Sequence, residues 1–197
     1  PRWLAARAAE PSHADVRAIG IVAVACVYVQ TLLGAWMRHT GAGLAIPDFP
    51  LSYGRVAPPF TSAGLDMVNA VRTRTYVLHY LDSIGPVAIH FAHRAWAAVV
   101  LAAIVTLLVA TVRRHGQSRL FVGLSAMAVG LVCAQALLGG LTIWTRKSVI
   151  PTTAHVALGS VILATAVVHA VIYRRCTTLE VDRAAATAPV SRGAAHA

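Results

Sequence analysis

The chain has 197 residues, of which 57% are apolar and only 12% are charged. A soluble domain carries about 25% charged residues, so this composition excludes an ordinary soluble globule and indicates an integral membrane protein. The formal net charge is +10, but the cationic residues flank apolar segments and form no single basic stripe. We therefore expect no nucleic-acid partner.

Four apolar segments follow a polar, Ala-rich lead-in at residues 1–17. They cover residues 18–37, 86–112, 120–144 and 150–173. A spanning helix needs about 20 residues at about 1.5 Å each, so all four segments qualify. The sequence predicts an all-α membrane protein, a four-transmembrane-helix bundle within residues 18–173. Residues 174–197 are expected to form a disordered tail.

The segment between the first two spans, residues 38–85, is expected to be a long outer loop. It contains GAGLAIPDFPLSYG, whose Gly and Pro residues exclude a regular helix. MVNAVRTRTYVLHYL, later in the loop, indicates a short amphipathic segment at the membrane interface. Most cationic residues lie in the lead-in, at 113–119 and in the tail. Both termini are therefore expected to be cytoplasmic.

An internal repeat relates the two halves of the bundle. QTLLG begins at Gln30 near the outer end of the first span, and QALLG begins at Gln135 near the outer end of the third. Each copy is followed by a span with a histidine near its outer start, His93 in one and His155 in the other. This repeat predicts two helix pairs with pseudo-two-fold symmetry. Both glutamines are expected to face the bundle, because lipid offers them no partner.

The two repeat-related histidines lie at similar depth. His93 is about 10 Å along its helix from the outer end, and His155 is about 7–8 Å along its own. Facing imidazoles at one depth in an apolar bundle suit the two axial positions of a haem iron. The alternative is that each histidine only joins helices by hydrogen bonds. A bare metal ion is disfavoured, because no acid lies in the four spans.

Other polar groups were assigned by their position in the chain. His90, one turn outward of His93, is a candidate to bind a haem propionate, to relay a proton, to ligate in place of His93, or to face water. Arg94 is expected either to pair with a propionate or to reach the interface. Candidate partners of the His155 ring are Ser148, Thr152 and Thr153. Packing is expected for His169, and solvent exposure for His39, His79 and His115.

Four stretches together resemble a known family. LLGAWMRHTGAGLAIPDFPLSYGR, IHFAHRAWA, QALLGGLTIWT and PTTAHVALG resemble the haem A synthase (CtaA/Cox15) family over about residues 18–173. The resemblance implies a protein of eight spans in two four-helix halves, each with a histidine pair for one haem. One half takes haem O and oxidises its methyl group to the formyl of haem A, and the other holds a haem b that moves electrons. His93 and His155 fall on the ligand positions of such a half.

The chain departs from the family pattern in ways that indicate which half it is. The substrate half commonly has Glu where this chain has His90, and a Cys pair where it has Ile46 and Ser52. The chain also has four spans rather than eight. These departures suggest the carboxy-terminal, haem b half of a longer protein, and a short four-span homodimer is the alternative.

The resemblance implies a haem A synthase, or its haem b half, in a bacterial-type plasma membrane. The implied partners are a second four-helix half or a homodimer partner, haem, the lipid bilayer and a haem O synthase. A non-catalytic b-type haem protein, acting in electron transfer or haem handling, is a second hypothesis. A transporter or structural bundle, with the histidines as packing groups, is a third.

Overall fold

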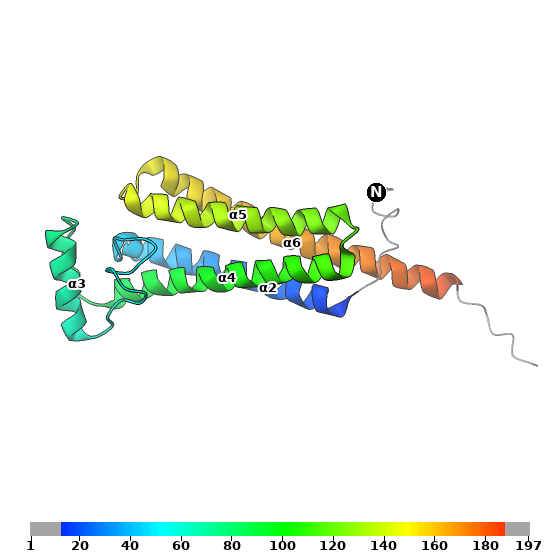
Figure 1. The fold of residues 1–197 in the computed structure, drawn as a ribbon, viewed down its shortest axis with the longest axis horizontal. Helices are drawn as coiled ribbons and strands as arrows, with labels where there is room; N and C mark the ends of the chain where they lie inside the picture. Colours follow the sequence, from blue (N-terminus) through cyan, green and yellow to red (C-terminus); the bar gives the residue numbers. More distant parts are fainter. Residues whose placement is uncertain (1–12, 188–197) are drawn as a thin grey trace, which may run out of the picture.

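The structure, a computed structural model, describes residues 13–187, with side chains through residue 175. Within this range every regular element is helical, apart from one isolated bridge between Ser52 and Arg55. The elements in chain order are α2 (Ala14–His39), η1 (Ala42–Leu44), α3 (Ser62–Arg74), α4 (Gly85–His115), α5 (Arg119–Trp144) and α6 (Val149–Thr187). Four long helices run side by side, and the short α3 lies across one end of them (Figure 1).

The four long helices are each long and apolar enough to cross a membrane. The spanning parts are Ala14–His39, Gly85–His115, Arg119–Trp144 and Val149–Arg175. The predicted spans and the predicted four-helix class are therefore confirmed, and the chain is an integral membrane protein. Each span begins or ends where charged residues or a left-handed turn interrupt the apolar run. For example, α2 ends before Gly41, whose φ of 67° suits glycine.

The helices pack as the two predicted pairs. α2 packs most extensively against α4, and α5 against α6, which confirms the pairing indicated by the internal repeat. α4 also contacts α5, and α2 also contacts α6, so the four helices close into a ring. α4 and α6 consequently lie on one diagonal of the bundle. Side chains from these two helices can therefore face each other across its interior.

Two apolar clusters lie on either side of His93 and His155, which together are called the histidine layer below. The larger fills the bundle and includes Val27, Val100 and Ile162 from three different helices. The smaller, which includes Ile46, Val68 and Val87, lies at the loop end of the bundle. Along α4, His93 comes between Val87 of the smaller cluster and Val100 of the larger one. The histidine layer is thus enclosed by apolar side chains at both ends.

Two segments differ from the sequence-based expectation. The amphipathic helix in the loop, α3, starts earlier than the predicted segment, because the Thr61 side chain accepts a hydrogen bond from the Gly64 amide and caps it. The last helix continues to Thr187, whereas residues 174–197 were expected to be disordered. The Ala, Leu, Glu and Arg residues of this extension favour helix. Residues 188–197 lie outside the described residues.

Candidate functional site

His155 on α6 is held by Gln135 on α5. The ring atom Nδ1 of His155 lies 3.1 Å from the main-chain oxygen of Gln135. A carbonyl oxygen only accepts, so Nδ1 carries the proton and Nε2 keeps its lone pair. The Gln135 side chain in turn donates from Nε2 to the main-chain oxygen of His155 at 2.9 Å. This tautomer is the one that a histidine needs to bind a metal through Nε2.

His93 on α4 is held in a related way by Gln30 on α2. The amide nitrogen of Gln30 donates to the main-chain oxygen of His93 at 3.1 Å. It also lies 3.3 Å from both ring nitrogens of His93, so the amide sits against the edge of the imidazole. The two copies of the repeat thus make the same contact, a glutamine bound to the histidine backbone of its paired helix.

The glycine that ends each repeat makes room for the ring. A Cβ at Gly34 would lie 3.1 Å from Cε1 of His93, and a Cβ at Gly139 would lie 3.1 Å from Cε1 of His155. Real Cβ atoms rarely come this close to a neighbour, so a side chain at either position displaces the imidazole. Each glycine follows its glutamine by one turn and lies on the same helix face. The Q-x-x-x-G spacing therefore builds a cradle for one imidazole.

The two imidazoles lie on the interior side of the bundle. His93 and His155 come from the diagonal helices α4 and α6. Both are half-buried. The side-chain oxygens of Gln30 and Gln135 are buried and have no hydrogen-bond partner among the described residues. Unpaired amide oxygens in an apolar bundle are costly, which is typical of a site that holds a ligand.

This layer fits a haem better than a bare metal ion. Among the described residues, no group of three or more His, Cys, Asp or Glu side chains gathers where it could hold a metal. Two imidazoles from opposite helices suit the two ligand positions that a haem iron would offer, and apolar clusters lie on both sides of them. The fixed Nε2 of His155 and the two glycine cradles are consistent with that fit.

His90 faces the outer loop rather than the interior. It is only 2% exposed, and its Nδ1 accepts from the main-chain amide of Ile46 at 3.1 Å. Its Nε2 lies 3.1 Å from Nε of Arg94. A neutral imidazole accepts at only one nitrogen, so the two donors compete for the ring. His90 is thus held by protein groups at both nitrogens.

Arg94 binds the backbone of the same loop. Its two terminal nitrogens donate to the main-chain oxygens of Leu51, at 2.9 Å, and Ile46, at 3.1 Å. The guanidinium also lies 5.6 Å from the centre of the Phe49 ring. The sequence did not predict these contacts with the loop backbone, and the pairing of Arg94 with a haem propionate stays a prediction. In this structure Arg94 holds the P-D-F-P-L stretch against α4.

The P-D-F-P-L stretch forms a compact cover over the end of the bundle. Both carboxylate oxygens of Asp48 accept main-chain amides, from Tyr53 and Gly54, each at 2.8 Å. Phe49 packs against α5, where a Cβ at Gly140 would lie 2.9 Å from its ring, and its ring centre is 5.9 Å from that of Trp144. This cover lies over the loop end of the bundle, beside the histidine layer.

A buried arginine ties the cover to α3. Arg72 is 5% exposed and donates to the main-chain oxygens of Leu44, at 2.6 Å, and Ala45, at 3.0 Å. The Tyr53 hydroxyl also donates to the oxygen of Ala45. Burial raises the pKa of this Tyr53 hydroxyl above its ordinary value. Arg72 could not be identified from the sequence, because an arginine in an amphipathic loop segment resembles an interfacial anchor.

Two further assignments differ from the structure. The His155 ring binds the main-chain oxygen of Gln135, and none of the three hydroxyl groups at Ser148, Thr152 and Thr153 is its partner. His115 was expected to face solvent, but it is 5% exposed and its Nε2 lies 2.9 Å from the Tyr173 hydroxyl. The end of α4 meets the middle part of α6 there, which a loop position in the sequence does not reveal.

His169 packs as expected from the sequence. It is 2% exposed and lies 3.0 Å from the Ser125 hydroxyl. Its ring is stacked on that of Tyr173, with centres 6.3 Å apart. It therefore belongs to a polar cluster at the end of the bundle away from the loop, separated from His155 by apolar side chains such as Ile162.

These features define a four-helix membrane bundle that presents a histidine from each of two diagonal helices under a loop cover. The sequence profile of the COX15-CtaA family, described as cytochrome oxidase assembly protein, matches residues 2–167. The chain belongs to this family.

Curated relatives agree with the family assignment. The chain is 31% identical over 156 residues to the Heme A synthase of Sphingopyxis alaskensis, covering 79% of this chain and 39% of that protein. It is 30% identical over 176 residues to the Heme A synthase of Methylobacterium radiotolerans, covering 87% and 45%. It is 32% identical over 152 residues to the Heme A synthase of a Caulobacter species, and the match covers 76% of this chain and 40% of that protein. The chain thus spans less than half the length of these relatives. No solved structure matches it.

Proposed function

We propose that this chain is one four-helix half of a haem A synthase and that His93 and His155 are the axial ligands of its haem b. The observation that carries the proposal is the matched pair of imidazoles on diagonal helices, each resting on a glycine of the repeat. His93 is favoured over His90 as ligand, because His93 rests on Gly34 as His155 rests on Gly139, while both ring nitrogens of His90 are bound by protein groups. The family match and the Heme A synthase relatives support the same function.

The chain's own residues orient and enclose the cofactor. Gln135 holds the proton of His155 at Nδ1 through its main-chain oxygen, so that Nε2 keeps the lone pair with which it would bind a haem iron. Gln30 holds the His93 backbone in the same layer. The loop cover around Phe49 excludes water from the outer side. Haem b, when bound there, supplies reversible one-electron transfer.

In the complete protein, haem O is the substrate and its methyl group is oxidised to the formyl group of haem A. This half delivers or accepts the electrons of that oxidation, and a second four-helix half, or a homodimer partner, holds the substrate. A haem O synthase is the partner that supplies it. The Glu of the substrate half is replaced here by His90, which supports the electron-carrying role.

A second candidate function is that of a non-catalytic b-type haem protein acting in electron transfer or haem handling. One observation favours it: Asp48, the carboxylate of the loop cover, is occupied at both oxygens by main-chain amides. No acid of the cover is therefore available to act on a substrate. The same two histidines serve both functions, so the two proposals share their cofactor and differ in the reaction.

The first test is a reduced-minus-oxidised spectrum of the purified chain with a pyridine haemochrome assay. A low-spin b-type spectrum near one haem per chain is expected. His155→Ala and His93→Ala should each abolish it, because each removes an axial ligand. His169→Ala is the matched control, since it removes a buried histidine of the same helix that lies away from the site. Full haem retention in His155→Ala contradicts the ligand assignment.

A second test separates the two functions. The chain is expressed with the adjoining half and with haem O, and haem A is measured by chromatography. Haem A that disappears in the His155→Ala variant supports the synthase. A full complement of haem b without any haem A, when both halves are present, favours the non-catalytic protein.

The orientation is a separate part of the proposal. Cationic residues such as Arg113, Arg114 and Arg119 gather at the end of the bundle away from the loop, which supports cytoplasmic termini in a bacterial plasma membrane. A Val56→Cys variant places a thiol in the loop at a residue that is 86% exposed. A membrane-impermeant maleimide should label it in intact spheroplasts. Labelling only in inverted vesicles reverses the orientation.

A further inference from the structure

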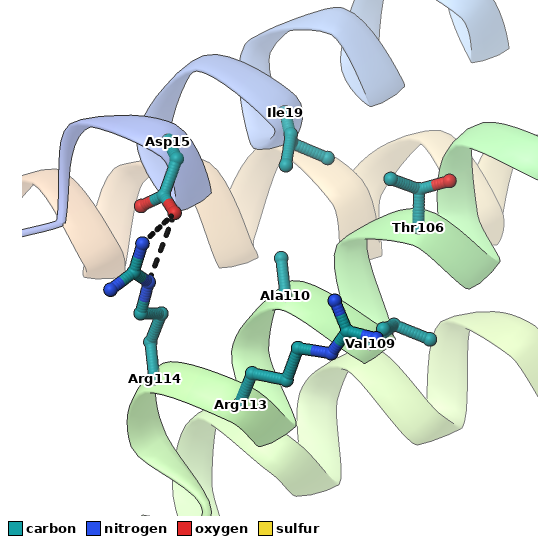
Figure 2. Close-up of a pocket in the computed structure, with 7 residues that line it drawn as sticks. All are labelled: Asp15, Ile19, Thr106, Val109, Ala110, Arg113 and Arg114. Carbon is teal, nitrogen blue, oxygen red and sulfur yellow. Dashed lines mark hydrogen bonds and ion pairs between the residues drawn. The ribbon is translucent and has the colours of Figure 1, made fainter.

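A cavity of about 450 Å³ opens between α2 and α4 at the end of the bundle away from the loop (Figure 2). Ile19 of α2 and Val109 and Ala110 of α4 form its apolar wall. Charged side chains, Asp15, Arg113 and Arg114, form its rim. The cavity lies outside the histidine layer and takes no part in the proposed function.

The rim carries an excess positive charge. Arg114 pairs with Asp15, with Nη2 2.9 Å from the carboxylate and Nε 3.0 Å from it, and both side chains are about half exposed. Among the described side chains, no carboxylate pairs with Arg113. Figure 2 shows the Arg113 side chain lying along the wall beside Val109, apart from the Asp15–Arg114 pair. Arg113 is therefore available to bind an anion of single charge.

The cavity extends from the charged rim toward the middle of α4. Thr106 lines its deep end, and seven residues of helix from Thr106 to Arg113 cover about 10 Å. The charged end is where α2 begins and α4 ends, so it lies at the level of the membrane interface. The apolar end lies within the spans. A phosphodiester at the arginines and a hydrocarbon chain along the wall match this gradient.

We propose that this cavity is a binding site for an anionic glycerophospholipid. The phosphate is bound by Arg113 and by the outer edge of Arg114, and an acyl chain lies against Ile19 and Val109. Basic pockets between transmembrane helices attract anionic headgroups, and each Lys or Arg near an anionic membrane surface strengthens binding about fivefold. Charge selects the headgroup and the apolar wall selects a lipid over a free phosphate.

The test measures lipid retention on the purified full chain in mild detergent. Dioleoyl phosphatidylglycerol or dioleoyl phosphatidylcholine is added, bound lipid is counted by native mass spectrometry, and the thermal unfolding midpoint is followed. Phosphatidylglycerol should be retained preferentially and should raise the midpoint. Arg113→Gln should weaken its binding about fivefold. Arg119→Gln is the matched control, since it removes an exposed arginine at the same end that does not line the cavity.

A variant that should bind lipid more tightly distinguishes a change in lipid binding from damage to the fold. Asp15→Asn releases Arg114 from its ion pair and should tighten phosphatidylglycerol binding, which a damaged protein does not do. Arg113→Lys keeps the charge and should keep the preference. Equal retention of the two lipids, or equal losses in Arg113→Gln and Arg119→Gln, overturns the proposal. Inorganic phosphate that reproduces the midpoint shift also overturns it, because the acyl chain then plays no part.

Discussion

The side chain of Gln135 donates to the main-chain oxygen of His155 at 2.9 Å, while the His155 ring donates back to the main-chain oxygen of Gln135 at 3.1 Å. This reciprocal pair fixes the rotation of α5 against α6 and the tautomer of the imidazole together. Gln30 makes the first of these bonds to His93 but places its amide against both ring nitrogens. The two copies of the repeat are therefore related but not identical, and only His155 has its tautomer fixed by a carbonyl.

The reciprocal pair makes a testable prediction for Gln135→Leu. The variant loses the side-chain bond between α5 and α6, which is worth on the order of 0.6 kcal/mol in a membrane bundle, but keeps the carbonyl that holds Nδ1. We expect the chain to fold and retain haem, with a shifted midpoint potential, because the orientation of the ligand changes. Potentiometric titration measures the shift. Thr142→Val is the control, since the Thr142 hydroxyl bonds only to its own helix, at Leu138. Equal potentials in both variants contradict a positioning role.

Gly139→Ala should displace the imidazole directly. Its Cβ would lie 3.1 Å from Cε1 of His155, so the ring must tilt or the helices must separate. We expect weaker haem retention and altered electron paramagnetic resonance g-values, which report the ligand planes. Gly130→Ala on the same helix is the matched control, because its Cβ meets nothing within 4 Å. That control should gain about 1 kcal/mol of helix stability instead. An unchanged spectrum in Gly139→Ala would show that Gly139 does not position the His155 ring.

The bundle and the polar layer were largely predictable from the sequence. Apolar runs of spanning length fix the helices, and the repeat at Gln30 and Gln135 predicts the helix pairs, because glutamines in a span must find polar partners. The repeat also ends in Gly34 and Gly139, small residues of the kind that let membrane helices pack closely. Their contact with His93 and His155 could not be predicted, because it depends on the rotation of each helix, which a short repeat does not specify.

The outer loop was the least predictable part. Its Gly and Pro residues excluded a helix but did not show that Asp48 folds it on itself or that Arg72 reaches its backbone from α3. Arg94 illustrates the same limit. A cation in a span needs a hydrogen-bond acceptor, and the sequence indicated only a haem propionate or the membrane interface for that role. Main-chain carbonyls brought over by a loop are acceptors that residue types do not reveal.

Arg94→Gln should loosen this loop. The variant loses donors to the main-chain oxygens of Leu51 and Ile46, and the partly buried Ile46 oxygen then lacks a strong partner. We expect faster amide hydrogen exchange across residues 46–54 and weaker retention of haem, since the cover opens the histidine layer to water. Arg55→Gln is the control, because that exposed arginine lies in the same loop. If exchange across the loop is as slow in Arg94→Gln as in Arg55→Gln, the contacts of Arg94 do not hold the loop in place.

Tyr53 should make the loop sensitive to alkaline pH. Burial raises the pKa of its hydroxyl above the ordinary value of 10.0, although Arg72 nearby opposes the shift. A raised folded-state pKa means that the neutral form is the one stabilised, so this stability is present below pH 10 and is lost as the pH rises through the folded-state pKa. Ionised Tyr53 cannot donate to the Ala45 oxygen and would face it as an anion.

We therefore expect limited proteolysis of the loop to accelerate above about pH 10. Tyr53→Phe should remove that alkaline step, whereas Tyr80→Phe should keep it, because Tyr80 is 67% exposed. An alkaline step that persists unchanged in Tyr53→Phe assigns the sensitivity to another group.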